Sequence, residues 1–188
     1  MTFLFEPDAL HALAQPMLGR PIDEAIDGLV EELRARYPGH INEERPIKWI
    51  WSLAGGVTGV MTILHASLSE YLLLFGAPGG SEGFSGRYHI DIHDFVLAGE
   101  MWTYREADPT RPVISGPGAH TLLERGAVKG VTLRPGTWLL EYARGPIATC
   151  LPMALGDSVF SAMDGTTIFD TFKVYARLTL RELLQGKI

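Results

Sequence analysis

Between residues 47 and 145 the chain consists of short apolar runs separated by glycine-rich breaks, and this pattern limits its possible folds more than any other feature. The runs have the length and the β-branched and aromatic content of strands. The 21 glycines and 12 prolines supply the many turns of a β core, and no GxxxxGK[ST] motif marks a phosphate loop. The sequence therefore predicts a mainly β sandwich or barrel. Its strands are expected near residues 49–53, 60–64, 71–75, 87–97, 100–105, 121–124, 128–133 and 137–143.

Helical patterns precede and follow this β region. A short helix is expected over residues 8–14, and a longer amphipathic helix runs from residue 21 to the Pro38 region. Residues 149–163 and 166–184 return to helical spacing. A length of 188 residues suits one domain. We therefore expect a single domain with a helical N-terminal part at 1–46, a β-barrel at 47–145 and two capping helices within 146–188.

Charge and composition exclude several function classes. A net charge of −6 without a Lys/Arg cluster argues against a nucleic-acid partner. The single Cys150 forms neither an internal disulfide nor a zinc site with paired cysteines. No signal peptide and no apolar run of about 18 residues is present, so we expect a cytoplasmic or peripherally membrane-associated chain without a transmembrane helix. The amphipathic segment 166–184 suits packing on the barrel or contact with a lipid surface.

A carboxylate lies in the middle of the expected strand at residues 137–143. Alternation along a strand places Glu141 on the same face as Leu139 and Ala143. Burying an ionised carboxylate without a partner costs roughly several kcal/mol, so Glu141 must be neutral, paired with a cation or hydrogen-bonded to fixed donors. The sequence therefore predicts a partner for Glu141.

The best candidate for that partner is Asp94. In the expected strand at residues 87–97 it shares an apolar face with Ile92 and Val96. Two carboxyls in one dry cavity do not both ionise cheaply, so one would hold a proton near neutral pH. We interpret Asp94 and Glu141 as a pair that could move protons or bind a cation. The alternative for each acid is a turn cap, an arginine partner or contact with water.

A metal site is a competing interpretation. His89, Asp91 and His93 share the opposite face of the Asp94 strand, in a His-x-Asp-x-His spacing that could bind a divalent ion. Further ligands would have to come from elsewhere, and the candidates are His65, His120 and Glu100. A serine triad is weaker still, because the chain has no GxSxG motif.

Several motifs together resemble one known family, that of the fungal C-8 sterol isomerase and the sigma-one receptor. The longest is LHASLSEYLLLFG at residues 64–76. The others are YPGH at 37–40, AGG at 54–56, SGRY at 85–88, GPG at 116–118 and TWLLEYARG at 137–145. The resemblance extends from about residue 29 almost to the C-terminus.

The resemblance implies a cupin-like β-barrel without a metal or other cofactor, two C-terminal helices that rest on a membrane, and a homotrimer. Asp94 and Glu141 match the two acidic positions of the family's ligand pocket, and Tyr71 matches a tyrosine that supports the second acid. Further ligand-binding positions that match are Met61, Ile63, Tyr71, Leu73, Phe75, Tyr88 and Ile92.

Three possible functions follow from the resemblance. One is isomerisation of a sterol or related polycyclic lipid from Δ8 to Δ7, with one carboxylic acid donating a proton and the other carboxylate accepting one. The alternative is a non-catalytic, receptor-like pocket for a cationic amphiphile or lipid, and isomerisation of a non-sterol lipid is a third reading. We expect no counterpart here of the receptor's N-terminal transmembrane helix. Phe84 stands where relatives have histidine and Val57 where the receptor has tryptophan, which suggests a different ligand.

Overall fold

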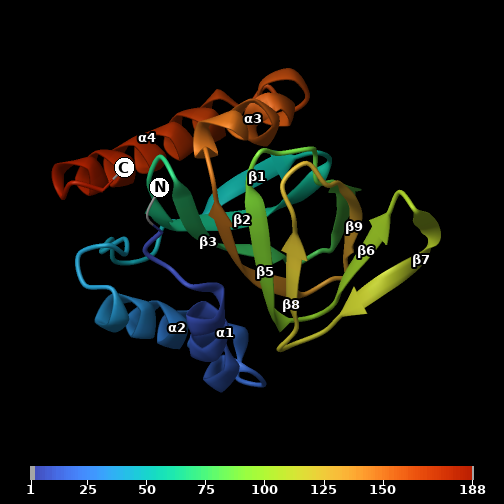
Figure 1. Ribbon diagram of the computed structural model, residues 1–188, viewed down its shortest axis with the longest axis horizontal. Coiled ribbons are helices and arrows are strands. Elements are labelled where there is room, and N and C mark those ends of the chain that lie inside the picture. Colours follow the sequence, from blue (N-terminus) through green and yellow to red (C-terminus); the bar gives the residue numbers. More distant parts are fainter. Residues whose placement is uncertain (1–2, 188) are drawn as a thin grey trace.

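The computed structural model of the protein describes residues 3–187, and its strands there form two antiparallel sheets (Figure 1). The six-stranded sheet runs β1 (Ile50–Ala54), β2 (Val57–Ala66), β3 (Glu70–Ala77), β10 (Thr137–Arg144), β5 (Asp91–Ala98) and β8 (His120–Leu123). The four-stranded sheet runs β4 (Ser81–Phe84), β9 (Lys129–Leu133), β6 (Met101–Arg105) and β7 (Asp108–Ser115). The expected mainly β fold, with helices before and after the strands, is confirmed. In the described residues, however, the strands form two sheets instead of one closed barrel.

Two strands, β4 and β7, were not expected from the sequence. The β4 strand has only four residues and contains Gly83, so its apolar signal is weak. The β7 strand contains Pro109 and Pro112, which lower strand propensity. It lies at an edge of its sheet, where a missing backbone donor is tolerated. In contrast, the strand expected over 87–97 begins only at Asp91.

Helices lie on two opposite sides of the sheets (Figure 1). On one side, α1 (Pro7–Ala14), the 3-10 turn η1 (Gln15–Met17) and α2 (Ile22–Arg36) follow one another. On the other, the 3-10 turn η2 (Ile147–Thr149) leads to α3 (Leu151–Phe160) and α4 (Gly165–Leu184). Asp8 lies in the first turn of α1, because the helix begins at Pro7, one residue before the expected start.

Strand alternation gives the six-stranded sheet two different buried faces. One face packs against α1 and α2 and forms the largest core cluster. From the sheet this cluster takes Leu64, Leu72, Leu74, Phe95, Leu97, Leu140 and Tyr142, and from the two helices mainly Leu10, Leu29, Val30 and Leu33. Burial of a large apolar side chain contributes about 1.5–3 kcal/mol, so this face anchors the sheet. The other face is left for a cavity between the sheets.

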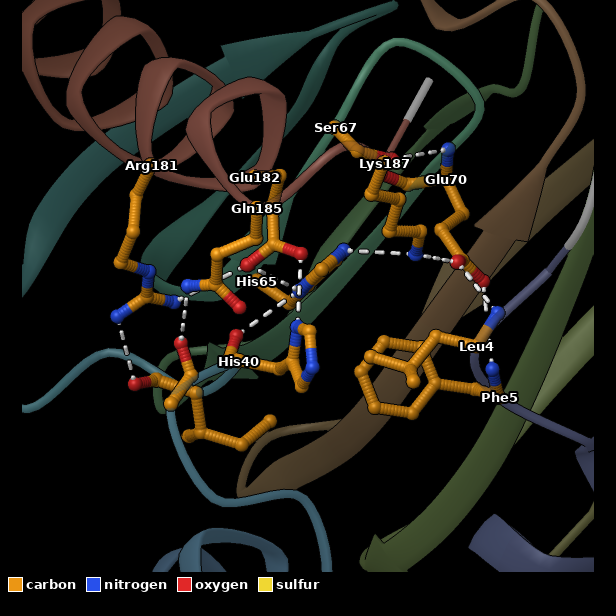
Figure 2. Close-up of polar contacts among 12 residues, drawn as sticks. Leu4, Phe5, His40, His65, Ser67, Glu70, Arg181, Glu182, Gln185 and Lys187 are labelled. Carbon is orange, nitrogen blue, oxygen red and sulfur yellow. Dashed lines mark hydrogen bonds and ion pairs between the residues drawn. The ribbon is translucent and has the colours of Figure 1, made fainter.

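Polar contacts attach the C-terminal end of α4 to the sheet (Figure 2). Glu182 is completely buried and its Oε2 accepts from His40 Nδ1 at 2.8 Å. Glu70 is also completely buried, and it accepts from the backbone N–H of Leu4 at 2.7 Å and from Lys187 Nζ. Because a buried carboxylate is costly without partners, these contacts fix the C-terminal end of α4 against the six-stranded sheet.

No helix within residues 3–187 combines the length and the apolarity that crossing a membrane requires.

Candidate functional site

Strand register brings the two predicted acids together. Glu141 lies in the middle of β10 and pairs directly with Asp94 of β5 on one side and with Leu73 of β3 on the other. The Cβ atoms of directly paired residues lie on the same face of a sheet about 4.5–5.5 Å apart. The pairing of the two strands therefore brings both carboxyl groups to one face, next to each other.

Both acids line one cavity of about 230 Å³ between the two sheets, and α3 and α4 contribute to its wall. Every residue predicted to bind a ligand also lines it: Met61, Ile63, Tyr71, Leu73, Phe75, Tyr88 and Ile92. The helices contribute Leu151, Ala154, Leu155, Ser158, Thr167, Thr171 and Tyr175. The walls are mainly apolar, as in pockets for lipids and other small molecules.

Glu141 is a carboxyl group poised to hold a proton near neutral pH. The Tyr71 hydroxyl donates to its Oε1 at 2.6 Å. Burial, reinforced by the negative charge of Asp94, raises the pKa of Glu141 to about 7, although the Tyr71 hydrogen bond and Lys129 act in the opposite direction. Burial and the neighbouring Glu141 also raise the pKa of Tyr71 well above its usual value, so this hydroxyl remains a donor.

Asp94 has a different set of partners. Its side chain is almost completely buried, and Lys129 Nζ donates to its Oδ2 at 2.6 Å. The Thr121 hydroxyl donates to the same oxygen at 3.4 Å. The contact with Lys129 is an ion pair, so Asp94 carries its negative charge. One cavity thus contains an ionised carboxylate and a carboxyl that exchanges its proton near pH 7.

Other groups in the cavity contribute little to acid–base chemistry at neutral pH. Burial raises the pKa of the Cys150 thiol to about 12, so it remains protonated and is a poor nucleophile. Burial raises the pKa of Tyr88 as well. Proton transfer at neutral pH therefore falls to the two carboxyl groups.

The side chains of the His-x-Asp-x-His motif do not meet at one site, and they contact different partners. Asp91 forms an ion pair with Arg125 at 2.8 Å. His93 lies on the α1 side of the sheet, where its Nδ1 is 2.9 Å from His120 Nε2. Burial and His120 lower the pKa of His93 to about 4, so the ring is neutral at physiological pH. Within residues 3–187 no three His, Cys, Asp or Glu side chains are grouped as metal ligands.

Lys129 is the functional candidate that sequence reasoning missed. It begins β9 and alternates with Val131 and Leu133, which line the same cavity. The alternation rule that singled out Glu141 would also have placed Lys129 on this apolar face. The sequence did not predict that α3 and α4 supply lining residues to the cavity, because a helical pattern does not show which cavity the helix will cover. Phe84 and Val57 do line the cavity.

Comparison with known proteins finds one family across nearly the whole chain. A sequence model of the family described as ERG2 and Sigma1 receptor like protein matches residues 1–187. The sigma non-opioid intracellular receptor 1 of Taricha granulosa is 39% identical over 181 residues, which are 96% of this chain and 81% of that protein. The protein erg2 homolog of Dictyostelium discoideum is 38% identical over 182 residues, 95% of this chain and 76% of that protein.

Solved structures similar to part of the chain include cupins. An RmlC-like cupin from Shewanella frigidimarina has a TM-score of 0.46 at 14% identity, over 57% of this chain and 90% of its own. A predicted oxalate decarboxylase from Thermotoga maritima has a TM-score of 0.47 at 15% identity, over 56% of this chain and 97% of its own.

Proposed function

The chain belongs to the family of ERG2 and sigma-1 receptor-like proteins, and from that premise we propose that it moves the double bond of a sterol or related polycyclic lipid from the Δ8 to the Δ7 position. The observation that carries this proposal is the pair of unlike carboxyl groups in one apolar cavity. Glu141 has its pKa raised to about 7, while Asp94 is ionised beside Lys129. Two acids held in different protonation states are suited to give and to take a proton in turn.

In the proposed reaction, neutral Glu141 donates its proton to C9 of the C8=C9 double bond. The electron pair of the alkene forms the new C–H bond and leaves a cation at C8. Asp94 then removes a proton from C7, and the electrons of that C–H bond form the C7=C8 double bond. The Glu141 carboxylate formed in the first step stabilises the cation, because opposite charges attract strongly in a cavity without water. After the product leaves, Asp94 gives its proton to water and Glu141 takes one from water, which completes the cycle, and no cofactor takes part.

The test is conversion of a Δ8 sterol in heavy water, followed by mass spectrometry. Wild-type protein should give a Δ7 product carrying one deuterium, and Glu141→Gln should lower the rate at least about a hundredfold, as expected for a lost general acid. Glu124→Gln is the matched control, since Glu124 is an exposed acid outside the cavity. Full activity in Glu141→Gln would refute the assignment, and no product from wild type would refute the reaction.

A receptor-like binding function is the second candidate, favoured by the receptors among the similar proteins. In this function Glu141, once ionised, would hold the ammonium group of an amphiphile inside the apolar cavity, and no reaction would follow. Amine binding without turnover of any Δ8 lipid would support it.

We also propose that α3 and α4 rest on a membrane. Their outer surface exposes large apolar side chains, with Phe160 at 85% and Leu184 at 89% exposure. The others are Val159, Met163, Phe169, Phe172, Leu180 and Leu183. An apolar patch of this kind on a soluble surface is unusual. Co-flotation with lipid vesicles should be lost in Phe160→Asp/Phe169→Asp. A homotrimer stays a prediction, to be checked by light scattering.

A further inference from the structure

Lys129 places a positive charge inside the cavity. It begins β9 in the four-stranded sheet, while its partner Asp94 lies on β5 in the six-stranded sheet. The Nζ to Oδ2 distance is 2.6 Å, and the lysine side chain is only 14% exposed. Lysine is seldom buried to this degree unless it is paired. The ion pair therefore joins the two sheets across the space that a ligand would enter.

This ammonium group changes the charge of the cavity as a whole. Among the described lining residues, the acidic and basic side chains are Asp94, Glu141 and Lys129. Asp94 and Lys129 cancel, so the net charge depends on Glu141 alone. Since that carboxyl exchanges its proton near pH 7, the cavity is neutral or carries one negative charge. Without Lys129 the same cavity would hold one more uncompensated negative charge.

Ligands of different charge respond differently to this arrangement. An ammonium group at Glu141 would be repelled by the Lys129 ammonium in a medium of low effective dielectric. A neutral polycyclic lipid experiences no such repulsion and leaves the ion pair intact. We propose that Lys129 determines ligand specificity in this cavity by disfavouring cationic ligands relative to neutral lipids. The inference rests on the proposed function, because it takes the cavity as the ligand site.

Calorimetric titration with two probes of the same ring system tests this role. One probe is a neutral Δ8 sterol, and the other is the same skeleton with a protonated amine in the ring region. Lys129→Met should bind the amine at least about tenfold more tightly than wild type does, the effect of removing one charge about 10 Å away at an effective dielectric of about 20. Sterol affinity should change less than about threefold. Lys129→Arg keeps the charge and should match wild type.

Because Lys129→Met leaves Asp94 buried without its partner, a double variant guards against an effect of misfolding. Lys129→Met/Asp94→Asn removes both members of the ion pair and keeps the net charge of the wild-type cavity, so its ratio of amine to sterol affinity should stay close to that of wild type. An unchanged ratio in Lys129→Met, or the same rise in the double variant, would overturn the role of Lys129, yet sterol binding would leave the proposed function standing. No binding of sterol to wild type would overturn both.

Discussion

Replacing Glu141 with glutamine should change how stability depends on pH, by an amount that follows from the structure. The folded protein keeps the Glu141 proton up to about pH 7, whereas the unfolded chain releases it near the ordinary value of 4.5. Between these values the folded state binds more protons, so its stability falls as pH rises. One pKa unit corresponds to about 1.4 kcal/mol, so Glu141 should cost the wild type about 2–3 kcal/mol of stability between about pH 5 and about pH 8. Glutamine, which does not titrate, removes this loss.

The assay is urea unfolding of wild type and Glu141→Gln at matched pH values, with the free energy of unfolding compared at each. Glutamine has nearly the same shape and keeps an oxygen for the Tyr71 hydroxyl, so packing should differ little. Buried histidines such as His93 titrate in both proteins and cancel in the difference. The variant should gain about 2–3 kcal/mol relative to wild type as pH rises from about 5 to about 8. Parallel curves would show that Glu141 ionises at an ordinary pH and would refute the reasoning.

Two further predictions concern neighbours of the acids. Tyr71→Phe removes a hydrogen bond to the charged carboxylate of Glu141 that is worth about 1.5–3 kcal/mol, so the pKa of Glu141 should rise by roughly one to two units. Carbon NMR titration of labelled glutamate can measure this pKa. An unchanged value would show that the hydrogen bond does not favour the ionised form. Gly76→Ala should lower the free energy of unfolding by about 1–3 kcal/mol, because a methyl group there would overlap the Trp138 indole. Gly79→Ala, with open space around it, is the matched control for denaturant unfolding, and equal costs would contradict this account.

Alternation was sufficient to find the acid pair. Asp94 and Glu141 each interrupt an apolar strand face, and period-two spacing places both on the cavity side without knowledge of the fold. The direct pairing of their two strands was not predictable from spacing alone, because strand order depends on distant contacts. The nine predicted site residues line one cavity, but their roles stay predictions.

The failures have equally specific causes. Lys129 looked like an ordinary charge at the start of a strand, and its long side chain reaches a carboxylate on the opposite sheet. Whether the strands close into a barrel depends on hydrogen bonds between edge strands. The spacing of apolar residues along the sequence does not predict these hydrogen bonds. Edge strands such as β7 also carry prolines that a central strand would not tolerate, so their sequence signal is the weakest.

Because Glu141 and Asp94 are paired through the backbone of two neighbouring strands, their positions do not depend on the side chains in the rest of the cavity wall. The distance between the two acids is a property of the β5–β10 register, which substitutions in the surrounding walls leave unchanged. Much of the remaining wall comes from α3, α4 and the β1 edge, where side chains can be exchanged one at a time. The wall formed by α3, α4 and β1 can therefore change while the positions of the two acids stay the same, so relatives with different ligands are expected to diverge most in these helices.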